Sequence, residues 1–352
     1  MCKLTHPLRL VWLIVGGGLL VTAISMAGCA GKANSSASGV SQTPSEPLFT
    51  PPVTEEPQGQ IAFVGDDGNL QLLGLPSGQL QALTKGEHIT SPAWSPDGTQ
   101  LACVHEIGSD SSHEIMLLDM VSQTQRTFSA LRDPMLANVS WSPDGRYLVG
   151  DVGCCASGRV LVLLDADGQV QRRIPYSFRY AWSPDGRYLA LGREVPLDQP
   201  IPIETGNSTS VVVLDVASGA EQVVAQGTPE ALYSPACWLS EKILVYRQLL
   251  WKEANQQGQH QLWQVVIDDP LKSVEPRTDL PSDCTGSVAI TMLPAELREG
   301  AGKASWSPDK QWLVVSVTQD RQPSIYLIQS ISYAVRRMAA GTEPVWRPTK
   351  LQ

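Results

Sequence analysis

The sequence RYAWSPDGRYLALG, residues 179–192, contains the pattern that decides the fold. Ser-Pro-Asp-Gly is a tight-turn sequence, in which proline presets φ, aspartate hydrogen-bonds to nearby backbone and glycine accepts the closing geometry. The turn joins two short strands, the first of which ends at Trp182. The segment therefore predicts an antiparallel β-hairpin.

This pattern is an internal repeat. Six tryptophans stand in one frame, four of them in strong copies and two in degenerate ones: Trp94, Trp141, Trp182, Trp238, Trp306 and Trp346. After the hairpin, each full unit continues with an apolar run that ends in Asp, such as VLVLLD at 160–165, then a second turn and a fourth strand. Units of this kind, repeated every 40 to 68 residues or so, predict an all-β fold: a six-bladed β-propeller of four-stranded antiparallel blades.

The two ends of the repeat region complete each other. The chain enters the region at 60–64 with a sequence that matches the second strand of a unit, and it leaves at 343–346 with one that matches a first strand. We therefore expect the C-terminal strand to pair with the N-terminal blade and close the propeller, which spans 60–352. Closure in this way removes exposed strand edges between the first and last units.

The Trp-Ser-Pro-Asp-Gly units resemble the WD-type repeats of the TolB-like six-bladed propellers, and the resemblance covers residues 60–350. It implies the propeller fold. It leaves the function open, because propellers of this type serve as partner-binding platforms, substrate filters of peptidases and ligand sensors.

The N-terminus predicts export. Residues 1–28 have a charged start and an apolar run from Leu10 to Met26, as in a secretory signal. Ala27-Gly28-Cys29 resembles the lipobox of bacterial lipoproteins, which implies lipidation of Cys29; an uncleaved signal anchor is the alternative. Residues 29–59 are rich in Ser, Thr and Pro and predict a disordered tether. Both alternatives predict an extracytoplasmic, membrane-anchored protein, on the periplasmic side or at the cell surface.

Charge and motifs exclude several functions. With 26 Lys and Arg against 35 Asp and Glu, the net charge of −9 and the lack of a basic cluster argue against nucleic-acid binding. The sequence has no Gly-x-Ser-x-Gly elbow, His-Glu-x-x-His pair or glycine-rich phosphate loop. We therefore predict no catalytic residues, no metal site and no cofactor. Two His and three acids at 105–114 leave a metal site as the alternative to a solvated polar loop.

Five cysteines remain after Cys2 and Cys29: Cys103, Cys154, Cys155, Cys237 and Cys284. In an oxidising compartment they allow up to two disulfides. We expect Cys237, beside Trp238, to be a small buried hydrophobe. Cys154 and Cys155 pair with each other, or one of them pairs with Cys103; the sequence does not decide between these alternatives.

Loop lengths and one repeat position suggest where a partner binds. The long connections 193–210, 247–261 and 277–302 all emerge on one face of the predicted propeller, and Trp251 lies in the second of them. The position three residues before each frame tryptophan is expected to line the mouth of the central tunnel. Its occupants are Ser91, Asn138, Arg179, Pro235, Lys303 and Glu343.

Two functions follow. The first is a non-catalytic binding platform for a protein, peptide or envelope polymer, with Arg179, Lys303, Glu343 and Trp251 as contact residues. The second is a metal-dependent lactonase or hydrolase with its site at the tunnel. A divalent cation needs several convergent carboxylates or imidazoles, whereas the six tunnel positions offer one acid among two cations, so we favour the platform.

Cys29→Ala should abolish acylation and mature processing, because the thiol is the group that carries the lipid. Metabolic labelling with a fatty acid and sequencing of the mature N-terminus measure this. Label incorporation into the variant equal to that of the wild type would rule out the lipobox.

Overall fold

The structure is a computed structural model that describes residues 56–108, 112–154, 158–176, 179–195, 208–228, 231–250, 259–268, 274–278 and 292–349. The chain divides into two compact units, Met1–Thr54 and Glu55–Gln352, and the second contains all of these residues. The predicted signal segment 1–28, Cys29 and most of the tether 29–59 lie outside them. None of the helices in the described part of the chain is long and apolar enough to cross a membrane.

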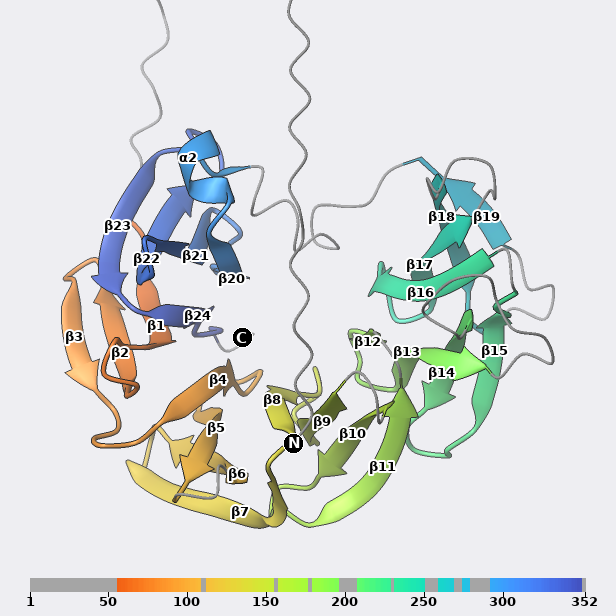
Figure 1. Ribbon diagram of the computed structural model, residues 1–352, viewed down its shortest axis with the longest axis horizontal. Coiled ribbons are helices and arrows are strands. Elements are labelled where there is room, and N and C mark those ends of the chain that lie inside the picture. Colours follow the sequence, from red (N-terminus) through yellow and green to blue (C-terminus); the bar gives the residue numbers. More distant parts are fainter. Residues whose placement is uncertain are drawn as a thin grey trace, which may run out of the picture. The chain divides into compact units, whose positions relative to one another are not determined.

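Six four-stranded antiparallel sheets make up the second unit, which confirms the predicted six-bladed propeller (Figure 1). Blade 1 contains β24 (Thr342–Trp346), β1 (Gly59–Val64), β2 (Leu70–Leu75) and β3 (Gln79–Ala82). Blade 2 contains β4 (Ile89–Trp94), β5 (Gln100–Ile107), β6 (Ser112–Asp119) and β7 (Thr124–Asp133). Blade 3 contains β8 (Leu136–Trp141), β9 (Leu148–Cys154), β10 (Gly158–Leu164) and β11 (Val170–Tyr176).

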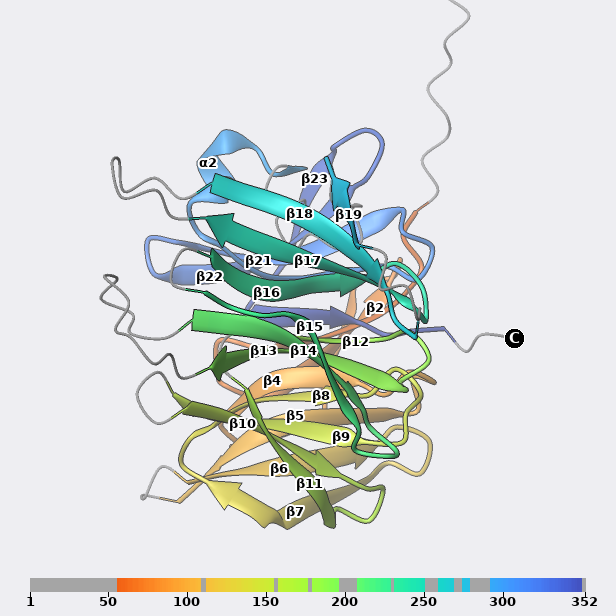
Figure 2. The same ribbon diagram turned by 90° about the vertical axis from the view of Figure 1, so that its right-hand side faces the viewer.

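The second half of the chain forms the other three blades. Blade 4 contains β12 (Tyr180–Trp182), β13 (Tyr188–Val195), β14 (Ser208–Asp215) and β15 (Glu221–Ala225). Blade 5 contains β16 (Ala231–Trp238), β17 (Ile243–Leu250), β18 (Gln259–Val266) and β19 (Val274–Arg277). Blade 6 contains β20 (Ala301–Trp306), β21 (Trp312–Gln319), β22 (Gln322–Gln329) and β23 (Val335–Ala340). The strands of all six blades run between the same two faces (Figure 2).

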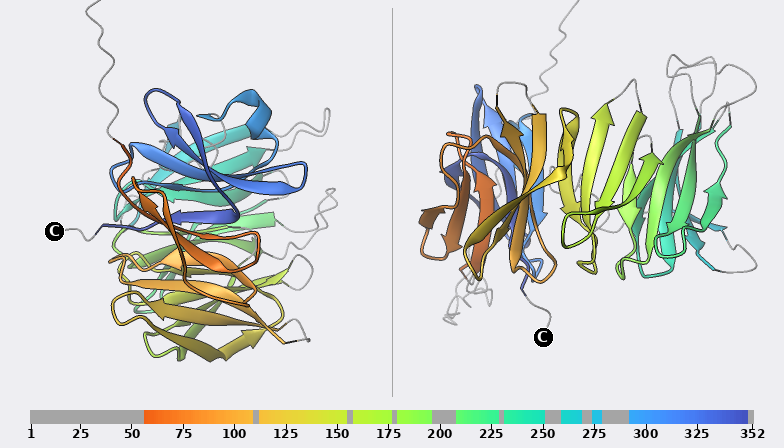
Figure 3. Two further views of the ribbon diagram at one scale, coloured as in Figure 1. Left: turned by 90° about the vertical axis from the view of Figure 1, so that its left-hand side faces the viewer. Right: turned by 90° about the horizontal axis from the view of Figure 1, so that it is seen from below.

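Blade 1 is built from both ends of the repeat region, as the sequence predicts. β24 pairs antiparallel with β1, with Ile61 opposite Trp346 and Ala62 opposite Val345. The C-terminal blue strands therefore lie beside the orange strands of blade 1 (Figure 3, left). The N-terminal strand is hydrogen-bonded on both of its edges, since β2 pairs with its other side.

The Ser-Pro-Asp-Gly turns contain a hydrogen bond that the sequence analysis missed. In the turn after Trp182, the hydroxyl of Ser183 donates to Asp185 Oδ1 over 2.6 Å and accepts from the backbone N–H of Tyr188 over 2.8 Å. The turns at Ser95, Ser142 and Ser307 repeat both bonds. All four serines are buried. The serine thus satisfies a buried N–H at the start of the second strand.

Each frame tryptophan packs in an apolar cluster on the side of its blade that faces the preceding blade. Trp94 and Trp346 lie in the clusters between blades 1 and 2 and between blades 6 and 1, with 8% and 5% of their surface exposed. Trp141, Trp182 and Trp238 pack at the next three junctions. Five of the six frame tryptophans therefore fill the space between neighbouring blades.

Three of the indoles also bond across the junction. The N–H of Trp238 donates to the carbonyl of Ala181 over 2.9 Å, that of Trp141 to Ala93 over 3.2 Å, and that of Trp94 to Val345 over 3.3 Å. In each case the acceptor directly precedes the tryptophan of the preceding blade. Within the described residues, the buried indole nitrogens of Trp182 and Trp346 have no hydrogen-bond partner.

The junction between blades 5 and 6 differs from the other five. Buried apolar clusters join the blades in the order 6, 1, 2, 3, 4 and 5, and none among the described residues joins blade 5 to blade 6 (Figure 1). On blade 6, the place of a preceding blade is taken by Met292, Leu293 and Leu297, which pack on its apolar face together with Trp306. Leu297 belongs to the short helix α2 (Ala295–Arg298).

Two expectations about the cysteines are corrected. Cys237 is disulfide-bonded and is not a small buried hydrophobe. Cys103 is a free, fully buried thiol, so it does not bridge to Cys154 or Cys155. Burial raises the pKa of the Cys103 thiol, which keeps it protonated and unreactive. Cys155 and Cys284 lie outside the described part of the chain.

Trp141→Phe should destabilise the protein more than Trp182→Phe. Both substitutions remove part of an indole ring, but only the first removes a hydrogen bond between blades, worth about 0.5 to 1.5 kcal/mol. The second removes a buried N–H that has no partner. Urea denaturation measures the two free energies of unfolding, and equal losses would show that the indole bonds do not hold the blades together.

Candidate functional site

Irregular pairing in three of the inner strands takes one residue of each strand out of the ladder. We call the residue three positions before each frame tryptophan the central position. In β4, β20 and β24 the register shifts across this position, which leaves Ser91, Lys303 and Glu343 without a pairing partner in the ladder. Ser91 and Glu343 have positive φ angles of 52° each. Bulges of this kind re-aim side chains and are common beside functional sites.

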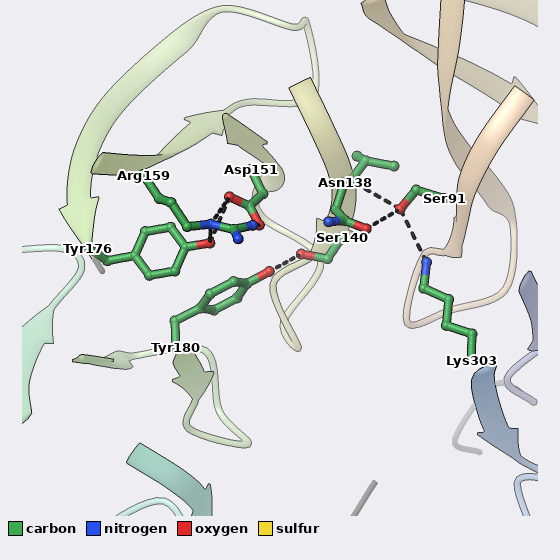
Figure 4. A network of polar contacts seen from close by, with 9 residues as sticks. Ser91, Asn138, Ser140, Asp151, Arg159, Tyr176, Tyr180 and Lys303 are labelled. Atoms are coloured by element: carbon green, nitrogen blue, oxygen red, sulfur yellow. Dashed lines mark hydrogen bonds and ion pairs between the residues drawn. The ribbon is translucent and has the colours of Figure 1, made fainter. Parts of the chain in front are cut away.

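Four central residues, from blades 2, 3, 6 and 1, meet in one network, which we call the central network: Ser91, Asn138, Lys303 and Glu343. The Ser91 hydroxyl donates to Asn138 Oδ1 over 3.3 Å and accepts from Lys303 Nζ over 3.3 Å (Figure 4). It also accepts from the backbone N–H of Val139 over 3.2 Å. Glu343 accepts from the Ser91 backbone N–H and pairs with Lys303 over 3.5 Å.

The residues of the central network differ in how much of their surface is exposed to solvent. Ser91 is 1% exposed, whereas the side chains of Lys303 and Glu343 are 42% and 30% exposed. The buried Ser91 therefore links its own blade to three others. Lys303 and Glu343 offer a donor and an acceptor to solvent or to a partner.

The structure brings together two of the four predicted contact residues. Lys303 and Glu343 form an ion pair, which the spacing alone did not predict. Arg179 is exposed and does not belong to the central network; it is the residue that precedes β12 in the sequence. Trp251 and most of the predicted long loops, at 196–207, 251–258 and 279–291, lie outside the described residues. The apolar end of the third loop is an exception, because Met292 and Leu293 pack on blade 6.

A second polar cluster, at the junction of blades 3 and 4, was missed by the sequence analysis. Asp151 is 5% exposed and accepts hydrogen bonds from Arg159 over 2.5 Å and from the Tyr176 hydroxyl over 2.7 Å (Figure 4). Burial, and then the bond to Asp151, raise the pKa of Tyr176. Nearby, Tyr180 and Ser140 share a hydrogen bond of 3.3 Å. The sequence does carry one signal for this cluster, because Asp151 is an acid within the otherwise apolar strand 148–152.

The polar segment around His105 is not the solvated loop that the sequence predicts. His105 lies in β5 and Glu114 lies opposite it in β6. His105 Nε2 contacts Glu87 over 2.5 Å, its Nδ1 lies 3.7 Å from Glu114, and Glu114 is 8% exposed. Among the described residues, no group of three or more His, Cys, Asp or Glu side chains has an arrangement that suits a metal ion.

Ser91 beside Lys303 has the composition of a Ser–Lys nucleophile pair, but its geometry does not serve catalysis. A nucleophile has to reach its substrate, and Ser91 is almost completely buried. Its oxygen already accepts two hydrogen bonds, from Lys303 and from the Val139 backbone. These bonds hold neighbouring blades together.

No protein-family model matches the sequence, and no curated protein matches it either. Among solved structures, TolB from Acinetobacter baumannii is similar, with a TM-score of 0.48 and 16% identity over 83% of this chain and 67% of that one. A putative TolB from Agrobacterium tumefaciens has a TM-score of 0.41 and 17% identity, covering 80% of this chain and 89% of that one. The propeller domain of the Trilobed protease from Pyrococcus furiosus has a TM-score of 0.45 and 13% identity, covering 76% and 73%. These similarities concern the fold, so the function is argued below from this chain's own residues.

Ser91→Ala should lower the free energy of unfolding by about 1 to 3 kcal/mol, because it leaves the buried N–H of Val139 without an acceptor and removes the bonds to Asn138 and Lys303. Ser91→Gly loses the same bonds but should cost less, since glycine adopts a positive φ without steric penalty. Urea denaturation compares the two. If Ser91→Ala unfolds at the wild-type urea concentration, the central network does not join the blades.

Proposed function

We propose that this protein is a membrane-tethered, extracytoplasmic propeller that binds a polypeptide partner at its centre, on the face where the second-to-third and fourth-to-first strand connections emerge. The observation that carries the proposal is the gathering of polar side chains from four different blades at equivalent positions. The exposed parts of Lys303 and Glu343 lie on a rigid base made by Ser91 and Asn138. Rigid scaffolds that present a few polar groups are typical of binding sites.

Strand direction supports the choice of face. Each inner strand runs toward its Ser-Pro-Asp-Gly turn, and the frame tryptophan lies at the turn end. A central position three residues earlier is about 10 Å nearer the opposite face, at about 3.3 Å per residue. We call the two faces the insert face, which carries the connections into each inner strand, and the turn face.

The tether and the location rest on the sequence. The apolar run before Cys29 and the following Ser, Thr and Pro-rich segment support export and attachment to a membrane. A propeller held in this way is positioned to capture a partner in the cell envelope.

The alternative, a metal-dependent lactonase or hydrolase, has weaker support. The six central positions hold one carboxylate, that of Glu343, and it is paired with Lys303. A divalent cation requires several oxygen or imidazole ligands that converge on one point. The donors at the centre do not supply such a set.

Photo-crosslinking can test the face directly, because the chain offers two exposed apolar residues on opposite sides. Met135, 41% exposed, lies in the connection between β7 and β8 on the insert face, and Val121, 76% exposed, lies in the turn between β6 and β7 on the turn face. A photoreactive residue at Met135, in intact cells, should give a discrete protein adduct, identified by mass spectrometry. The same residue at Val121 is the matched control.

Adducts from Val121 and none from Met135 would place the binding surface on the turn face. The absence of adducts from both positions would contradict the platform itself.

A further inference from the structure

Two arginines of neighbouring blades lie close together at the centre. Arg179 occupies the central position of blade 4, and Arg247 lies in β17 of blade 5, opposite Ser234 and next to the central residue Pro235. The pKa of the Arg247 guanidinium is lowered, first by burial and then by the positive charge of Arg179. The two positive charges therefore lie close enough to influence each other.

Neither guanidinium forms an ion pair with any described residue, and no acid contributes to the pKa of Arg247. Several other arginines of blades 3 and 4 do have carboxylate partners. Arg159 pairs with Asp151 over 2.5 Å, Arg187 with Asp215 over 3.1 Å and Arg193 with Glu221 over 2.6 Å. In a chain with a net charge of −9, Arg179 and Arg247 thus leave a local excess of positive charge at the centre.

Backbone contacts place Arg179 beside blade 5. The N–H of Gly192 donates to the carbonyl of Arg179 over 2.8 Å. A Cβ atom at Gly192 would lie 3.4 Å from that carbonyl oxygen and 3.5 Å from Pro235, which is ordinary van der Waals contact with both. The backbone of Arg179 and the central residue of blade 5 are therefore neighbours at this point. Arg179 is exposed, so its guanidinium is available to a ligand.

The balance of charges at the centre determines the charge of a ligand that would bind there. Lys303 is neutralised by Glu343, which leaves the charges of Arg179 and Arg247 uncompensated. Like charges brought together and partly desolvated raise the free energy of the site, and a bound anion lowers it again. The planar guanidinium group matches a carboxylate or phosphate through two parallel hydrogen bonds.

We propose that Arg179 and Arg247 form an anion site that takes a carboxylate of the partner's polypeptide. The inference rests on the proposed function and specifies its ligand. A carboxylate on a short segment is favoured over a polyanion, because the rest of this acidic chain repels extended negative charge.

Fluorescence anisotropy of the full chain in detergent tests the site. The probes are a rhodamine-labelled five-residue peptide with two glutamates and the same peptide with glutamines. The glutamate peptide should bind, with an affinity that falls as salt is added. Arg179→Gln with Arg247→Gln should weaken its binding about tenfold or more, as expected for the loss of charge-assisted hydrogen bonds.

The matched control is Arg146→Gln with Arg187→Gln. These two arginines are paired with Asp144 and Asp215, and their side chains are 55% and 53% exposed. The control changes the net charge by the same amount and should leave peptide affinity unchanged. An equal loss in both double variants would mean that only net charge matters and would overturn the site.

Two further outcomes would also overturn it. One is equal affinity for the glutamate and glutamine peptides. The other is saturable binding of inorganic phosphate without any binding of the glutamate peptide, which would make this a small-anion site. If the glutamate peptide is not preferred but the Met135 adduct still forms, the binding platform is supported and this ligand is not. If the Met135 adduct does not form either, the binding platform itself is contradicted.

Discussion

The hydrogen bond from a tryptophan indole to the backbone carbonyl of the preceding blade sets the geometry of the propeller. An indole N–H that is buried needs an acceptor, and the carbonyl just before the neighbouring tryptophan is in reach only when two blades meet in one register. The bonds from Trp94 to Val345, from Trp141 to Ala93 and from Trp238 to Ala181 therefore fix the height of the inner strand against its neighbour at three junctions. Because the central position is counted from the same tryptophan, this register also brings the central residues to one level.

The polar side chains reach the centre because the backbone of the inner strands is locally strained. A regular inner strand would point every second side chain into a blade junction, where Lys303 or Glu343 would be buried at high cost. The bulges at these positions turn the side chains inward, and the positive φ angles of Ser91 and Glu343 are the local penalty. The penalty is offset by bonds that Ser91 makes to three other blades.

The fold followed from the sequence because its signals are local and repeated. The Trp-Ser-Pro-Asp-Gly turns and the two half-units at the chain ends were sufficient to predict six blades and their closure through β24. The site was predicted only in part. The frame identified Lys303 and Glu343, but the network depends on bulges, and no turn-like signal marks a bulge. Contacts between segments that are distant in the sequence decided the rest. Asp151 is buried and bonded to Arg159 and Tyr176 from two other strands of its blade, and Met292 and Leu293 pack on blade 6.

The position of blade 1 has a mechanical consequence. A pulling force on the chain before residue 59 enters through β1, which is held by β24 on one edge and β2 on the other. To extract β1, the force has to break two ladders at once. Blade 1 is also joined to blades 6 and 2 by apolar clusters, so the load spreads in both directions, away from the junction of blades 5 and 6 where no such cluster exists among the described residues. A force on the N-terminal segment would therefore enter the propeller at a blade that is joined to both of its neighbours.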